Sequence, residues 1–189
     1  MKIFKTLFLA ITILISTHTV VAQKVRKIDT QKSKIEWTGK KLTSSHHGTI
    51  DFSKGSLTFV NNKLVGGNFV VDMNTINTTD ISGKSKERLD GHLKADDFFG
   101  VKNHPESTLE FKTIETTDNP EIYKVTADLT IKGITHPATF DLKLNKIGAS
   151  TKVIVNRILY DIKYASTGIG ALADKAISDD FELNVALVY

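Results

Sequence analysis

Histidine is the residue type in this 189-residue sequence that is best suited to chemistry, because a neutral imidazole binds zinc or copper well. The candidate metal ligands are His46, His47, His92 and His104, and His136 could join them. Asp96 and Asp97 follow His92 closely in the sequence. The spacing matches no ligand pattern, and the sequence has no cysteine to add a thiolate. We therefore predict no metal and no cofactor, and keep a histidine-based metal-binding or metal-dependent protein as an alternative.

Nucleophiles and paired acids are also present without a supporting motif. Ser44 and Ser45 precede a histidine, but no Gly-x-Ser-x-Gly elbow occurs. Gly168-Ile169-Gly170 lacks the further glycine and the lysine of a phosphate-binding loop. The neighbouring acids Asp179 and Asp180 resemble turn or capping residues more than a pair that shares a catalytic proton. The sequence predicts no catalytic residues and no enzyme.

The elements that would position any site show a period of two, which is the side-chain alternation of a β-strand. Alternation of this kind recurs at residues 34–38, 56–59, 68–73, 109–112, 123–129, 138–144 and 181–189. Asn61-Asn62 and Lys132-Gly133 are typical hairpin turns between such strands. A long antiparallel meander with one apolar face must curl on itself or pair with a second sheet. We expect an all-β fold, an antiparallel barrel of about eight strands.

Two segments interrupt this rhythm. Residues 84–93 favour a short helical insert, in which Leu89 and Leu93 share one face. A turn with Phe98 and Phe99 follows, and together they are expected to close one end of the barrel. The second segment lies further along the chain, where we expect a flexible loop at 166–170 and a short helix at 171–177.

The first 22 residues have the pattern of a secretory signal peptide: a basic start, a short apolar run and small residues before Gln23. We predict cleavage after Ala22, with residues 23–189 forming one domain that works in the periplasm of a double-membraned bacterium. An uncleaved membrane anchor is the alternative. Losing Lys2 and Lys5 lowers the net charge from +4 to +2, which is too small to indicate nucleic acid as a partner.

The apolar strand faces are the remaining candidate for function. The residues that we expect to contact a ligand are Trp37, Phe59, Phe69, Val71, Phe111 and Phe140. An eight-stranded barrel can be filled by such side chains or can hold one small ligand among them. Alternation alone also allows an inside-out barrel in a membrane, but one Trp and four Tyr are too few for two aromatic girdles.

Several blocks of the sequence resemble the YceI-like proteins. The blocks are IEWTGKK at 35–41 with HHGTI at 46–50, LDGHLKADDFF at 89–99 with HP at 104–105 and LEF at 109–111, DLTIKGITHP at 128–137, and DDFEL at 179–183. They follow one another across nearly all of the expected mature chain.

The resemblance implies a lipocalin-like antiparallel β-barrel that is secreted and commonly periplasmic. It also implies a long-chain isoprenoid or another amphiphilic lipid as the partner, held in an elongated apolar cavity without stable insertion into a membrane. Each buried CH₂ stabilises such a complex by about 0.8 kcal/mol, so a chain lipid needs no polar motif. A barrel with a filled core, acting as a structural or interaction module, is the second alternative.

Overall fold

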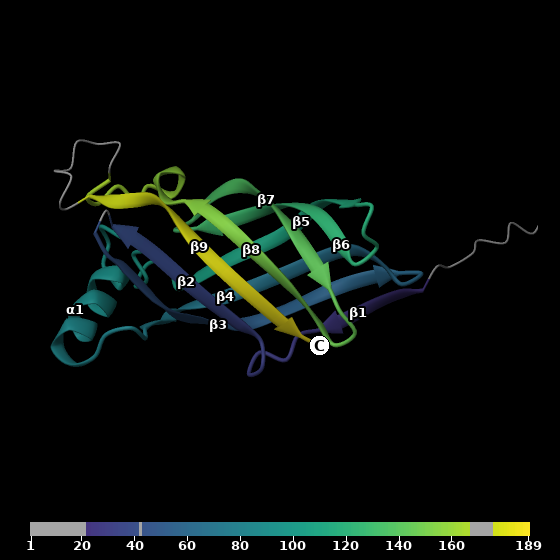
Figure 1. Cartoon of the computed structure of the whole chain (residues 1–189), viewed down its shortest axis with the longest axis horizontal. Coiled ribbons are helices and arrows are strands. Elements are labelled where there is room, and N and C mark those ends of the chain that lie inside the picture. The colour runs from purple at the N-terminus through teal and green to yellow at the C-terminus, as the bar shows by residue number, and fades with distance from the viewer. Residues whose placement is uncertain (1–21, 42, 167–175) are drawn as a thin grey trace, which may run out of the picture.

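The computed structural model describes residues 22–41, 43–166 and 176–189, and within them the protein is mostly β-structure. The strands are β1 (Gln23–Lys27), β2 (Lys34–Lys41), β3 (Ser45–Val60), β4 (Lys63–Thr78), β5 (Glu106–Thr116), β6 (Ile122–Ile131), β7 (Ile134–Leu144), β8 (Gly148–Asn156) and β9 (Ile177–Val188). The helix α1 spans Gly83–Lys94, and a short 3-10 helix, η1, spans Arg157–Tyr160. Figure 1 shows the strands wrapped around one long axis, with α1 at one end.

Eight of these strands form a closed antiparallel barrel. The order around it is β3, β2, β9, β8, β7, β6, β5 and β4, and β4 pairs again with β3 to complete the ring. The ninth strand, β1, lies on the same edge of β3 as β2 but pairs with the opposite half of β3, from Ser56 to Val60. The expected all-β barrel of about eight antiparallel strands is therefore confirmed.

The two hairpin turns identified in the sequence adopt the backbone conformation that tight turns require. Asn61 and Asn62 have φ angles of 50° and 61°, and Lys132 and Gly133 have φ angles of 55° and 74°. Two successive residues with positive φ match the right-handed twist of the strands that they join. These turns place β3 beside β4, with several shifts of register along the pair, and β6 beside β7 in continuous register.

The apolar face of each strand points into the barrel. Leu57, Val125 and Leu142 are almost completely inaccessible to solvent, and most other alternating apolar residues are buried with them. The opposite faces carry lysine, glutamate and threonine, as along β6, where Lys124 and Thr126 alternate with buried neighbours. The inside-out arrangement is therefore not the one that the protein adopts.

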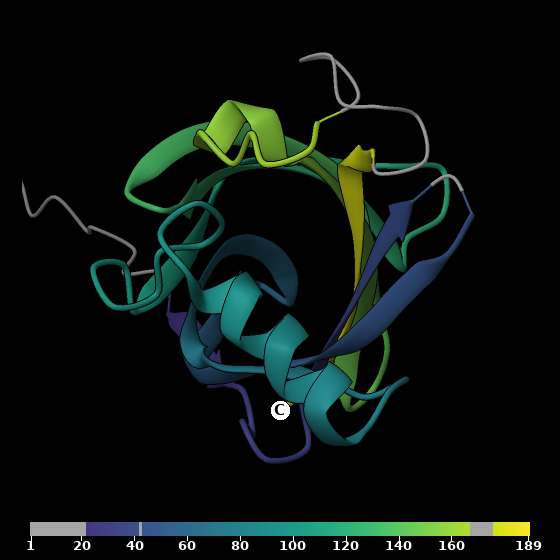
Figure 2. The same cartoon turned by 90° about the vertical axis from the view of Figure 1, so that its left-hand side faces the viewer.

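Helix α1 confirms the helical insert expected at residues 84–93. Leu93 is buried, Leu89 is partly buried against the core, and the following turn brings Phe98 into the same cluster. Figure 2 looks into this end of the barrel and shows α1 lying across part of its opening. We call it the helical end.

Some expectations fall outside the described residues. They include almost all of the signal peptide at 1–22, the loop at 166–170 beyond Ser166, and most of the short helix at 171–177. At the last position of that helix the expectation was wrong, because Ile177 is the first residue of β9.

Candidate functional site: an apolar cavity inside the barrel

The barrel interior contains an apolar cavity with two compartments. The wide compartment has a volume of about 140 Å³, and the inner compartment has a volume of about 90 Å³. Both are lined by Ile35, Val71, Ser107, Leu129 and Leu183, which form the wall between them. The compartments are therefore neighbours along the barrel axis.

The wide compartment lies at the helical end. Its walls include Leu93 from α1, Phe98 and Phe99 from the turn after it, and Phe181 from β9. Phe99 meets Phe98 and Phe181 edge to face, with ring centroids 5.1 and 6.1 Å apart. The sequence placed two aromatic residues in this turn, but it gave no reason to assign them to a ligand site.

The inner compartment is bordered by a row of four phenylalanines from different strands. Ring centroids lie 6.0 Å apart between Phe52 and Phe69, 5.7 Å apart between Phe69 and Phe111, and 6.0 Å apart between Phe111 and Phe140. Edge-to-face and tilted pairs at these separations are favourable. We call these four residues the phenylalanine row.

Five of the six residues expected to contact a ligand lie in the cavity walls. Trp37 lines the wide compartment, Val71 lines both compartments, and Phe69, Phe111 and Phe140 line the inner one. The indole nitrogen of Trp37 donates to the carbonyl of Thr49 at 3.2 Å, which fixes the ring in place.

The sixth residue, Phe59, lies elsewhere. Its ring packs against Tyr189, with centroids 6.2 Å apart, and the guanidinium of Arg26 lies 4.9 Å from its centroid. It does not belong to the lining of either compartment. Alternation predicted correctly that Phe59 faces inward. It could not show where along the barrel the interior is hollow, because that depends on which side chains of the neighbouring strands fill the space.

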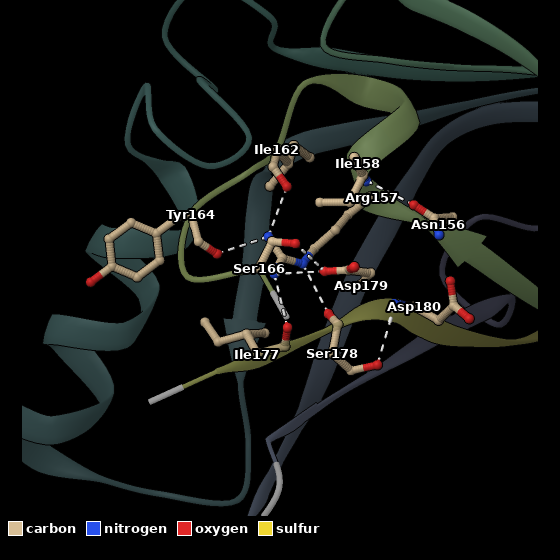
Figure 3. A network of polar contacts seen from close by, with 10 residues as sticks. All are labelled: Asn156, Arg157, Ile158, Ile162, Tyr164, Ser166, Ile177, Ser178, Asp179 and Asp180. Atoms are coloured by element: carbon tan, nitrogen blue, oxygen red, sulfur yellow. Dashed lines mark hydrogen bonds and ion pairs between the residues drawn. The ribbon is translucent and has the colours of Figure 1, made fainter. Parts of the chain in front are cut away.

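Among the described residues, Arg157 is the one cationic side chain in the cavity lining, and it is only 2% exposed. Figure 3 shows how its guanidinium is held by main-chain carbonyls of two segments. Nε donates to Ser178, one terminal nitrogen donates to Ile162 and Tyr164, and the other donates to Ile177. That last nitrogen also lies 3.6 Å from the Asp179 carboxylate.

These contacts give Arg157 a structural role. Burial lowers the pKa of its guanidinium, and the nearby Asp179 carboxylate opposes that effect. An arginine has five N–H donors, and here they are directed to carbonyls and a carboxylate of the protein itself. Arg157 therefore holds two chain segments together at the wide compartment, and its donors are already engaged.

One of these segments covers a gap in the barrel wall. Strands β7 and β8 pair only between Leu142–Leu144 and Ala149–Thr151, and they separate toward the helical end. The chain from η1 onward covers that gap with Tyr160 and Ile162, which are 2% and 0% exposed. Burial raises the pKa of the Tyr160 hydroxyl accordingly.

The remaining polar lining of the wide compartment is acidic or neutral. Ser178 and Asp180 belong to it, and Asp180 is exposed to solvent, so the cavity is close to the surface there. The sequence suggested Lys40, Lys41 or Arg88 for a charged headgroup, but the cavity lining includes none of them. Lys40 instead pairs with Glu182 at 2.6 Å, and together with Lys152 it lowers the pKa of that carboxyl to about 2.

The histidines are dispersed. Nδ1 of His46 lies 2.8 Å from the Asp80 carboxylate, while His92 packs edge to face on Tyr164 at 4.4 Å. Desolvation by burial raises the pKa of the Asp80 carboxyl, but hydrogen bonds from His46 and His47 outweigh this effect and keep the pKa below its ordinary value. Across residues 22–41, 43–166 and 176–189, no three His, Asp or Glu side chains gather as a metal site would require. In the same residues no helix is long and apolar enough to span a membrane.

A closed antiparallel barrel with an apolar hollow toward one end defines a lipocalin-like class of binding protein. The sequence matches the family model of the YceI-like domain over residues 27–189. The chain therefore belongs to the YceI-like family, as the motifs in its sequence indicated.

Two curated relatives match part of the chain. UPF0312 protein SA2479 of Staphylococcus aureus is 44% identical over 73 residues, which is 39% of each chain. UPF0312 protein PC1_2518 of Pectobacterium carotovorum is 39% identical over 70 residues, 37% of this chain and 35% of its own. The aligned segments thus span well under half the length of these curated relatives.

Solved structures cover more of the chain at lower identity. BcnA of Burkholderia cenocepacia is similar with a TM-score of 0.69 and 18% identity, over 86% of this chain and 99% of its own. The YCEI protein of Campylobacter jejuni gives a TM-score of 0.51 and 20% identity, over 98% of this chain and 96% of its own. At such identities the comparison establishes the fold.

Proposed function

We propose that this protein binds a long-chain amphiphilic lipid, of the polyisoprenoid kind, with the chain in the barrel interior and no chemical step. The observation that carries the proposal is the cavity itself, whose lining is almost entirely aliphatic and aromatic. A hollow of this composition excludes polar ligands, because their groups would lose water without gaining hydrogen bonds. Hydrocarbon has no such penalty.

Burial of the chain supplies the affinity. Each CH₂ that leaves water contributes about 0.8 kcal/mol, and the loss of translational and rotational freedom on binding offsets part of the total. The two compartments follow one another along the barrel, which suits an extended chain better than a compact ring system. The polar end of the ligand would lie near Ser178 and Asp180, where the lining meets solvent.

The same proposal places the protein outside the cytoplasm. Its support is the pattern of residues 1–22, and β1 begins at Gln23, directly after the predicted cleavage site. Intact-mass measurement of the protein from separated cell fractions tests this location. A periplasmic species that begins at Gln23 is expected, and a full-length species in the cytoplasm would contradict it.

Lipid extraction and native mass spectrometry of the protein from its own source test the binding. We expect a retained mass that dissociates as a chain lipid. A matched pair of variants makes the test specific. Val71→Lys places an ammonium in the wall shared by the compartments, whereas Ile154→Lys changes a side chain that is 53% exposed on the outside of β8.

The Val71→Lys variant should lose the lipid, and the Ile154→Lys variant should retain it, with both folded by circular dichroism. Gently purified wild-type protein without any bound chain would contradict the proposal. That result would favour instead a barrel with a filled core that acts as a structural or interaction module.

A further inference from the structure

The depth of the cavity can be followed residue by residue along two neighbouring strands. On β4, Met73 lines the wide compartment, Val71 lines both compartments and Phe69 lines only the inner one. On β5, Ser107 lines both compartments, and Phe111 lines only the inner one. Four residues of strand span about 13 Å, so the backbone of Phe111 lies about that far from Ser107 along β5, away from the helical end.

The barrel is packed solid next to the phenylalanine row. Leu57 and Val125 are both 0% exposed, and Val125 pairs with Phe140 across β6 and β7. The cavity lining includes neither of these packed residues, and on β4 and β5 it ends at Phe69 and Phe111, whereas on β7 and β9 it continues to Leu142 and Leu187. On the β4 and β5 side of the barrel, a chain that enters from the helical end therefore meets the row as the floor of the cavity.

Phe111 is the member of the row that lies where the pairing of two strands ends. The β4–β5 pairing ends at Asn68 and Glu110, so Phe111 is the first residue past the point where the two strands separate. Its ring lies against Gly67, where an added Cβ would come within 2.5 Å of the ring edge. Phe111 is also partly exposed, whereas Phe69, Phe52 and Phe140 are buried.

The neighbour across the next strand leaves room for this ring. Ala127 on β6 pairs directly with Phe111 and is 0% exposed. A small residue there lets Phe111 reach Phe140 on β7, with the ring centroids 6.0 Å apart. Phe111 thus closes the floor between the separating strands and the rest of the row.

We propose that Phe111, held in position by Gly67, sets the length of hydrocarbon chain that the cavity accepts. This inference rests on the proposed function and adds to it a specificity-determining residue. A chain gains affinity with each methylene until its end reaches the Phe111 ring, and further methylenes remain in water. A smaller side chain at position 111 moves this limit to longer chains, and a larger one moves it to shorter chains.

A series of n-alkyl maltosides of increasing chain length, each used below its micelle concentration, provides the measurement. Trp37 is the only tryptophan of the sequence and lines the wide compartment, so its fluorescence reports occupancy. Calorimetry supplies the dissociation constants. For wild-type protein we expect affinity to rise by up to about fourfold per methylene and then to level off at a definite length.

The variants shift this break in opposite directions. Phe111→Ala should move it to longer chains by about three methylenes, which occupy roughly the space of the lost ring, and Phe111→Leu should move it less. Phe111→Trp should shorten the accepted chain. Gly67→Ala should also shorten it, because the new Cβ pushes the Phe111 ring into the inner compartment.

Phe59 supplies the matched control, because it faces the same barrel interior but lies outside the cavity lining. Phe59→Leu and Phe59→Ala should leave the break where it is in wild-type protein. If either alanine variant fails to fold, the comparison of the two leucine variants decides the question. A break that does not move in folded Phe111→Leu or Phe111→Ala protein overturns this inference alone. Wild-type protein that binds no alkyl maltoside of any length overturns the proposed function and this inference with it.

Discussion

The most severe loss of stability is expected from replacing Arg157. Arg157→Met keeps the length and the apolar stem of the side chain but removes the guanidinium. The Asp179 carboxylate then loses its cation. Four main-chain carbonyls also lose a donor, namely those of Ile162, Tyr164, Ile177 and Ser178. The variant tests whether this guanidinium holds the η1 segment onto the barrel.

The magnitude follows from the burial of these groups. The hydrogen bond to Ile162 is buried, and an acceptor left without a donor there costs about 1–3 kcal/mol. Breaking a buried charge pair from one side costs about 3–5 kcal/mol. Because the other carbonyls and Asp179 keep some contact with water, we expect the free energy of unfolding to fall by about 4 kcal/mol. Arg157→Lys should lose less, since an ammonium can reach only some of the carbonyls.

Urea unfolding followed by circular dichroism measures this loss. Hydrogen exchange should locate it, with faster exchange at the amide of Ile177, which donates to the carbonyl of Ala165. Lys124→Met is the control, because this exposed lysine lies on the outer face of β6 and its replacement should change stability little. A loss under about 1 kcal/mol for Arg157→Met, with no change in local exchange, would refute the structural role of this guanidinium.

Three further outcomes concern other parts of the barrel. Gly48→Ala should lower the free energy of unfolding by about 3 kcal/mol in urea titrations, because its Cβ would lie 2.0 Å from the Asn77 carbonyl oxygen. Asn62→Gly should increase the free energy of unfolding by about 0.5 kcal/mol, because a positive φ costs glycine less than asparagine. A slightly higher thermal midpoint would show this gain. Glu182 has a pKa of about 2 in the folded protein, below its ordinary 4.5, so its stabilising effect is complete above pH 4.5 and is lost as pH falls toward 2. Wild-type and Glu182→Gln thermal midpoints should therefore converge over that range, and a constant difference would contradict the lowered pKa.

The sequence predicted most of the barrel because its signals are local. Alternation along β6 and β9 and the turns at Asn61-Asn62 and Lys132-Gly133 are short-range features that tertiary packing did not override. Helix α1 was predicted from a similar local pattern.

The alternation pattern did not predict two of the strands, and the structure shows the physical reasons. Strand β8 buries Val153 and Val155 but also carries the exposed Ile154 between them, so its apolar residues form a run and not an alternation. Strand β1 is nearly all polar and exists because β3 is long enough to pair with it as well as with β2.

The candidate site was predictable in its composition but not in its position. Inward-facing aromatic residues could be identified, yet alternation could not separate Phe59 in a packed region from Phe111 beside a hollow. Arg157 was missed altogether, since its role depends on carbonyls from segments about twenty residues away, such as Ile177 and Ser178. Backbone acceptors of this kind leave no trace in residue types.

The order of strands around the ring has a consequence for biogenesis. β9, the last strand along the chain, lies between β2 and β8, so Lys34 near the start pairs with Ala186 near the end. The barrel cannot complete its hydrogen-bonding until β9 has been synthesised. Until then the edges of β2 and β8 that β9 covers stay unpaired, and unpaired strand edges of this kind favour aggregation.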